Sequence, residues 1–201
     1  MASRETLQSI WKQIENNRVE SISSRYFVPP SSLTAIFTPL AISKAVAELK
    51  CDPVDRIGLA QAIQLDGTVT FAILVWMRVE DAIVEFRRHR CLDSSLPLDE
   101  PRARKIAPNF GYTFCNEVQW EFWPYFFHRN EDVEIRLTEI LPFIQEVEQQ
   151  KLGGFGAVAQ LVVHPSLQDF YPRKVTRPVL CRSHLMPLKP DLTRDCRMHQ
   201  L

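Results

Sequence analysis

The sequence predicts an α+β protein, with a mainly helical N-terminal region that contains one buried strand, then a β-hairpin and an irregular tail. Three observations lead to this prediction. Apolar residues recur at helical spacing along the first half of the chain, one continuous β-branched and aromatic run interrupts them, and two strand-like segments flank a glycine-rich turn. The expected divisions are residues 1–140, 141–170 and 171–201.

The composition is that of a globular protein, and its zero net charge produces no strong overall electrostatic field. Of the 201 residues, 45% are hydrophobic and 24% are charged, and the formal net charge is zero. Because no net charge draws the chain toward polyanions, we expect no nucleic-acid partner. The longest apolar run, Phe71–Met77, is far shorter than the roughly 20 residues that cross a bilayer. We therefore expect a cytoplasmic protein with no membrane partner and with its five cysteines reduced.

A series of helices is expected before the Asp66-Gly67 turn. Ser3 is the expected N-cap of a first helix, whose apolar stripe at spacing i, i+3, i+4, i+7 consists of Leu7, Ile10, Trp11 and Ile14. Such a stripe packs on the body of the protein or docks on a partner, and we expect packing. Further helical pieces are expected at residues 33–37, 39–49 and 52–66.

A buried strand is expected next, at Thr68–Met77, because this run is short, β-branched, aromatic and preceded by a turn. A helix should then begin at Glu80 and end in the basic run 87–90, where positive charge complements the helix dipole. Residues 92–107 contain prolines and predict a linker. The aromatic segment Trp120–Phe127 is expected to line a core seam where two layers meet.

The last third of the chain predicts a hairpin followed by irregular structure. Residues 143–152 and 157–164 are expected to be antiparallel strands around the glycine turn. From residue 171 onward, periodicity disappears and prolines accumulate. This tail carries seven Lys and Arg against Asp191 and Asp195, a balance of +5. A solvated tail is the expected state, and contact with an acidic surface is the alternative.

Two C-x₂-H pairs in the tail suggest a different chemistry. Cys181 with His184, and Cys196 with His199, could supply four ligands to a tetrahedral zinc ion and so order the tail. C-x₂-H pairs are less usual than C-x₂-C pairs, and few apolar residues lie between these two. We therefore expect no metal, with zinc as the weaker alternative.

The glycine-rich turn is the most specific motif. Half of the six glycines lie within residues 153–156. A turn without Cβ atoms adopts positive φ angles and approaches phosphate groups closely enough for backbone N–H groups to donate to them. The candidate nucleotide-binding residues are Gly153, Gly154, Phe155, Gly156 and Val158. Lys151 stands where a kinase Gly-x-Gly-x-x-Gly-x-Val loop has its first glycine, so ATP is an optional ligand and a plain hairpin turn is the alternative.

Several sequence blocks in a fixed order resemble one protein family. They are residues 70–77, 95–99, 116–122, 140–144, 153–158 and 163–166. Over roughly residues 25–170 the chain resembles the serine/threonine protein-kinase-like proteins of filamentous fungi, which carry a helical N-terminal region before a kinase domain. The resemblance implies that residues up to about 140 are that region and that residues 141–170 are the first two strands of a kinase N-lobe.

The groups that phosphoryl transfer requires do not follow the glycine turn in the expected order. These groups are a third-strand lysine, a catalytic-loop aspartate and a metal-binding aspartate. Lys174 is the single candidate for the lysine, and we do not expect it to serve. The sequence therefore predicts a truncated, non-catalytic kinase-like protein that acts as an interaction or regulatory module with a protein partner. The alternatives are an ATP-binding regulatory fragment and a helical protein-binding module with no nucleotide role.

Overall fold

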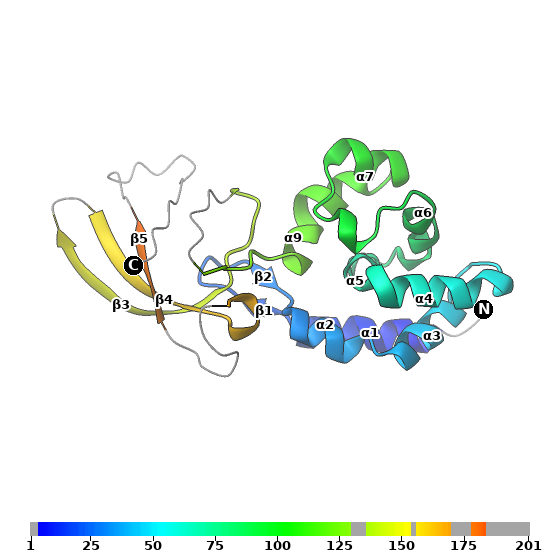
Figure 1. Ribbon diagram of the computed structural model, residues 1–201, viewed down its shortest axis with the longest axis horizontal. Coiled ribbons are helices and arrows are strands. Elements are labelled where there is room, and N and C mark those ends of the chain that lie inside the picture. Colours follow the sequence, from blue (N-terminus) through cyan, green and yellow to red (C-terminus); the bar gives the residue numbers. More distant parts are fainter. Residues whose placement is uncertain (1–3, 130–135, 154–155, 170–177, 184–201) are drawn as a thin grey trace. The chain divides into compact units, whose positions relative to one another are not determined.

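Figure 1 shows the computed structural model, which describes residues 4–129, 136–153, 156–169 and 178–183. Contacts divide the chain into two compact units. Unit 1 consists of Met1–Arg18 and Val28–Trp123, and unit 2 consists of Val19–Phe27 and Pro124–Leu201. The chain thus passes into unit 2, returns to unit 1 and leaves it again. The boundaries expected at residues 140 and 170 follow sequence character rather than contacts, and they stay predictions.

The protein is α+β and mainly helical, as the sequence predicts. The α-helices of unit 1 are α1 (Glu5–Asn16), α2 (Pro30–Ile36), α3 (Pro39–Ala47), α4 (Arg56–Asp66), α5 (Thr68–Trp76), α6 (Ile83–Arg88), α7 (Glu100–Ile106), α8 (Gly111–Thr113) and α9 (Gln119–Phe122). Between them lie the 3₁₀ turns η1 (Pro53–Asp55), η2 (Glu80–Ala82) and η3 (Asp93–Ser95), and the π-helical segment η4 (Phe114–Val118).

The helices expected before residue 67 are confirmed, and the apolar stripe of α1 packs inward as expected. Leu7, Ile10 and Ile14 are buried in the core of unit 1. Arg4 occupies the N-cap position and makes no side-chain cap, whereas Ser3, the expected N-cap, lies outside the described residues. Instead, the Glu48 carboxylate accepts hydrogen bonds from the first N–H groups of the helix, at 2.9 and 3.1 Å.

Residues 68–77 do not form the predicted buried strand, since Thr68–Trp76 is helix α5. Every residue from Thr70 to Val75 is buried. A helix that is buried on all sides shows no apolar stripe, so its sequence is the same continuous apolar run that a buried strand has. Tertiary packing and hydrogen bonds at both helix ends therefore override the β propensity of this run.

The N-terminus of α5 is capped by a carboxylate from a distant segment. Asp93 accepts hydrogen bonds from the backbone N–H groups of Val69 (2.9 Å) and Thr70 (2.7 Å), and from the Thr70 hydroxyl (2.8 Å). Beside it, Asp66 accepts from the backbone N–H and the hydroxyl of Ser94, both at 2.7 Å. Burial raises the pKa of the Asp93 carboxyl, and the hydrogen bonds from the helix oppose that rise.

The C-terminus of α5 ends in a tight turn with an arginine in the left-handed region. Arg78 has a φ of 61°, and the N–H of Val79 donates to the carbonyl of Leu74 at 2.9 Å. This is the hydrogen bond of a Schellman turn, in which the left-handed residue is usually glycine. Arg90 takes the corresponding position after α6, with a φ of 55°.

An arginine–tryptophan cluster, made of Trp11, Arg18, Trp76 and Arg78, joins α1 to the end of α5. The two indole rings stack with centroids 5.1 Å apart, and the indole N–H of Trp11 donates to the Trp76 carbonyl at 3.2 Å. The guanidinium of Arg78 lies 4.3 Å from the Trp11 ring, and that of Arg18 lies 4.7 Å from the Trp76 ring. Arg18 also pairs with Glu121 at 2.8 Å.

Residues 92–107 are not the predicted linker, because they contain η3 and helix α7. The Asp99 carboxylate caps α7 by accepting from the N–H of Arg102 at 2.8 Å, and Pro101 lies in the first turn, where its missing N–H costs nothing. Helix α8 then approaches α7 closely. A Cβ on Gly111 would lie 2.5 Å from the Ala103 backbone, so this contact requires glycine.

Within its described residues, unit 2 contains two antiparallel sheets. One pairs β1 (Val19–Glu20) with β2 (Tyr26–Phe27), and the other has the order β3 (Phe143–Gly153), β4 (Gly156–Val163), β5 (Pro178–Ser183). The predicted hairpin is therefore confirmed. The prediction of irregular chain after residue 170 is wrong for β5, which pairs with β4 from Ala157↔Ser183 to Val162↔Pro178. The turn η5 (Pro165–Leu167) follows β4.

Each unit has its own hydrophobic core, so the aromatic segment Trp120–Phe127 is divided between them rather than forming one seam. Phe122 belongs to the core of unit 1, whereas Phe127 belongs to that of unit 2, together with Phe143, Leu161 and Val163.

Hydrogen bonds attach the β1–β2 hairpin to the rest of unit 2. Arg25 donates to three carbonyls of one turn, those of Leu137, Thr138 and Glu139.

Replacing Asp93 with alanine tests the cap of α5. We expect the free energy of unfolding to fall by about 1–3 kcal/mol, because buried N–H groups of the helix lose their acceptors. Asp93→Asn keeps one acceptor oxygen and should cost less. Urea unfolding followed by circular dichroism measures both losses. Equal losses in the two variants would contradict the capping role.

Candidate functional site

The glycine-rich turn lies at the tip of the β3–β4 hairpin. Gly153 and Gly156 are partners in the antiparallel register and so close the turn, and Val158 lies in β4. The register shifts between Gln150 and Gly153, which makes the strand pairing irregular beside the turn. The other two candidates lie outside the described residues, namely Gly154 and Phe155. An antiparallel hairpin is compatible with a phosphate-covering loop and with a plain turn.

The candidate zinc ligands fall almost entirely outside the described residues. The backbone of Cys181 lies in β5, whereas His184, Cys196 and His199 are not described. Within the described residues, no group of three His, Cys, Asp or Glu side chains is placed to hold a metal ion. The zinc site stays a sequence-based alternative.

The two described histidines of unit 2 have different partners. Nδ1 of His164 lies 2.9 Å from the Ser166 hydroxyl and accepts from the Ser166 N–H at 3.3 Å, so the imidazole caps η5. Burial lowers the pKa of His164, which favours the neutral ring that such acceptance requires. Nδ1 of His128 instead lies 3.2 Å from Asp169. Serine and aspartate therefore contact different imidazoles, and these contacts do not form a catalytic triad.

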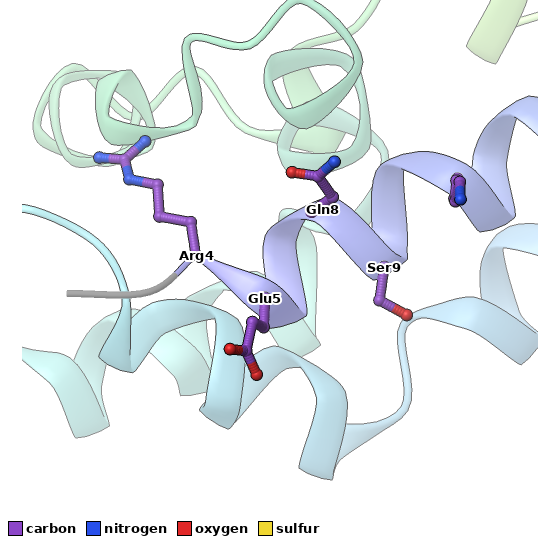
Figure 2. A pocket seen from close by; sticks show the side chains of 5 residues that line it. Arg4, Glu5, Gln8 and Ser9 are labelled. Atoms are coloured by element: carbon purple, nitrogen blue, oxygen red, sulfur yellow. The ribbon is translucent and has the colours of Figure 1, made fainter. Parts of the chain in front are cut away.

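One depression lies beside α1, as Figure 2 shows. It has a volume of about 390 Å³, and its described lining residues are Arg4, Glu5, Gln8, Ser9 and Lys12. All of them belong to α1 or its N-cap, so one helix supplies every described wall and its side chains do not converge on a ligand. Arg4 is already engaged, since its guanidinium pairs with Glu80 and, at 2.7 Å, with Asp81.

A groove between α3 and α4 is lined from both helices. Its volume is about 330 Å³, and its lining residues are Ser43, Arg56, Ile57, Ala60, Gln61 and Gln64. Aliphatic side chains, two amides and one guanidinium thus meet there without a carboxylate. We call this groove, together with the exposed apolar residues of the elements that form it or precede them, the α3–α4 face; these residues are Leu40 in α3, Val54 in η1, and Ile57 and Leu65 in α4.

Four large apolar side chains of α3, η1 and α4 stand in solvent. The exposed fractions are 65% for Leu40, 86% for Val54, 74% for Ile57 and 86% for Leu65. Single exposed apolar residues are common, but a group on two adjoining helices is typical of an interaction surface.

Periodicity did not reveal the α3–α4 face. Helix α4 carries apolar residues on two sides, and Leu59 and Ile63 are the pair that the core buries. A sequence with apolar residues on both sides of a helix does not say which side faces solvent. The signal that could have found the face is the excess of large apolar residues over what one buried stripe requires.

Comparisons with known proteins add no relative. No protein-family model matches the chain, and no curated protein or solved structure is significantly similar to it. The likeness to kinase-like proteins therefore depends on the sequence blocks alone. In the described residues, no single helix is long and apolar enough to cross a membrane, while η1–α4 and α5 together reach that length with a bend of 105° between them.

The environment of His164 predicts how unit 2 responds to pH. Its pKa in the folded protein lies below the ordinary value of 6.5, so the unfolded chain binds a proton more readily. The stability that His164 contributes is complete above pH 6.5 and is lost as the pH falls through the folded-state pKa. Titration of the imidazole resonance by NMR should give a midpoint below 6.5. A midpoint above that value would contradict the buried, accepting ring.

Proposed function

We propose that this chain is a non-catalytic interaction module, kinase-like in sequence, that binds a protein partner through the α3–α4 face. The observation that carries the proposal is that α3, η1 and α4 expose large apolar side chains, one of which, Ile57, lines the groove between the two helices. Covering such a side chain stabilises a complex by roughly 1.5–3 kcal/mol relative to leaving it in water. Four of them on neighbouring elements therefore favour association with another protein surface.

The face is held rigid before any partner arrives. Helix α4 is anchored by Leu59 and Ile63, which are buried in the core of unit 1. The turn before it is fixed as well, because the Asp52 carboxylate accepts from the N–H of Val54 at 3.0 Å. A preformed surface loses little conformational entropy on binding, so more of the burial energy appears as affinity.

The groups available for chemistry support a non-catalytic role. Phosphoryl transfer needs a lysine, a base and a metal-binding aspartate, and these do not follow the glycine turn in the sequence in kinase order. Among the described residues of unit 2, the Asp169 carboxylate accepts a hydrogen bond from the backbone N–H of Arg129, and the His164 ring accepts one from that of Ser166. Both hydrogen bonds hold turns in place. An interaction module requires none of these catalytic groups.

A charge placed on the face tests the proposal. Ile57→Asp should abolish capture of the partner from an extract of the source cells, with at least a tenfold loss, because burying an unpaired carboxylate is costly. Leu137→Asp, on an exposed residue of unit 2, is the matched control and should capture the partner normally. Quantitative mass spectrometry compares the two. Identical captured proteins for both variants, or phosphate transfer that depends on the glycine turn, would contradict the proposal.

A nucleotide-binding regulatory role at the glycine turn is the second candidate, favoured by the pairing of Gly153 with Gly156 at the hairpin tip. If ATP binds there, millimolar ATP with magnesium should raise the melting temperature. At a hundredfold excess of ATP over its Kd, the free energy of unfolding rises by about 2.7 kcal/mol. Gly156→Ala should remove the shift. No shift in the unaltered chain would exclude the nucleotide role and leave the interaction module untouched.

A further inference from the structure

We infer that the partner segment is an amphipathic helix that carries a carboxylate beside its apolar side, and that this carboxylate pairs with Arg56. The inference rests on the proposed function, since it names the chemistry of what the α3–α4 face binds. Two features carry it: the shape of a groove between adjoining helices, and a guanidinium in that groove without an anionic partner in the described chain.

A third helix is the occupant that the two helical walls of the groove favour. The groove runs between α3 and α4, with Ile57 and Ala60 as aliphatic lining and Leu40 on the neighbouring helix. Side chains spaced i, i+3, i+4 and i+7 on an incoming helix pack into the furrow between two helices. The elements that form the face are helical, so it has no open strand edge that would take an extended peptide by main-chain pairing.

Arg56 supplies the charge preference. It lines the groove, and its Nε–H is shielded from solvent with no hydrogen-bond acceptor within the described chain. A buried donor without an acceptor raises the free energy of the unbound protein. A carboxylate relieves this cost, because it accepts from the guanidinium in a planar, two-bond geometry once the side chain turns toward it.

Two further cations lie on or against the helices that form the groove. Lys44 is exposed next to the groove residue Ser43, and the exposed Arg87 lies with its guanidinium against Gly58 of α4. None of these three cations forms an ion pair with a described carboxylate. The acidic residues nearby, Asp52 and Asp55, belong to the η1 end, where Asp52 already caps the turn.

The test compares two synthetic probes on the full chain. Both are fluorescein-labelled helical peptides of about 18 residues, or five turns, with the same leucine stripe. One carries glutamate beside the stripe and the other carries lysine. Fluorescence anisotropy gives the Kd of each. We expect the glutamate peptide to bind at least tenfold more tightly than the lysine peptide, with a difference that shrinks at high salt.

Three variants separate the contributions. Arg56→Gln should weaken the glutamate peptide about tenfold and leave the lysine peptide unchanged. Ile57→Ser should weaken both peptides, and Leu137→Ser, on unit 2, should weaken neither. Circular dichroism checks that each variant is folded. Equal affinity for the two peptides, or no effect of Arg56→Gln, would overturn the inference.

Other occupants of the face give distinct results. Sedimentation of the chain alone shows whether a second copy covers the face, in which case Ile57→Ser abolishes dimers. Flotation with vesicles that contain phosphatidylserine shows whether a membrane does. Either result overturns the inference. If neither peptide binds while partner capture still depends on Ile57, the proposed function stands and the acidic helix is excluded; if capture is also independent of Ile57, both fall.

Discussion

A helix buried on all sides must satisfy its terminal N–H and C=O groups without water, and α5 imposes this requirement on all of unit 1. Asp93 meets it at one end and thereby fixes the segment before α7. The indole N–H of Trp11, which donates to the Trp76 carbonyl, and a Schellman turn meet it at the other end and thereby fix α1. Elements far apart in the chain are thus positioned by the two termini of a nine-residue helix.

The α3–α4 face is a product of the same arrangement. Helix α4 precedes α5 directly, with only Gly67 between them and a bend of 105°. Once α5 occupies the centre, α4 has one side to pack with and one side left in solvent. The apolar residues on that second side contribute nothing to the core, which is why their presence calls for another explanation, and an interaction surface supplies it.

Sequence reasoning succeeded where one element shows one periodicity. Helices α1 to α4 and the β3–β4 hairpin follow from apolar spacing and from Gly, Pro and Asp at their ends. It failed at α5, whose capping group Asp93 is far from the helix in sequence. It failed also at α7, where the cap Asp99 and Pro101 in the first turn are local signals, but the prolines of the segment predicted a linker. Strand β5 depends on pairing with β4, which no local pattern shows. The α3–α4 face could not be predicted, because which side of α4 is buried is a tertiary property. The glycine turn was visible in the sequence as a motif, and its two tip residues lie outside the described residues.

The return of the chain from Val19–Phe27 to unit 1 has a kinetic consequence. Unit 1 is rich in helices, whose internal contacts form quickly. Unit 2 is completed only when the β1–β2 hairpin meets residues that lie roughly a hundred positions later, a closure whose entropy cost grows with the logarithm of the loop length. During synthesis the hairpin emerges early and waits without its partners until the segment beyond Trp123 arrives. Unit 1 therefore assembles first, and by holding both connections to the hairpin it shortens the search by which unit 2 closes.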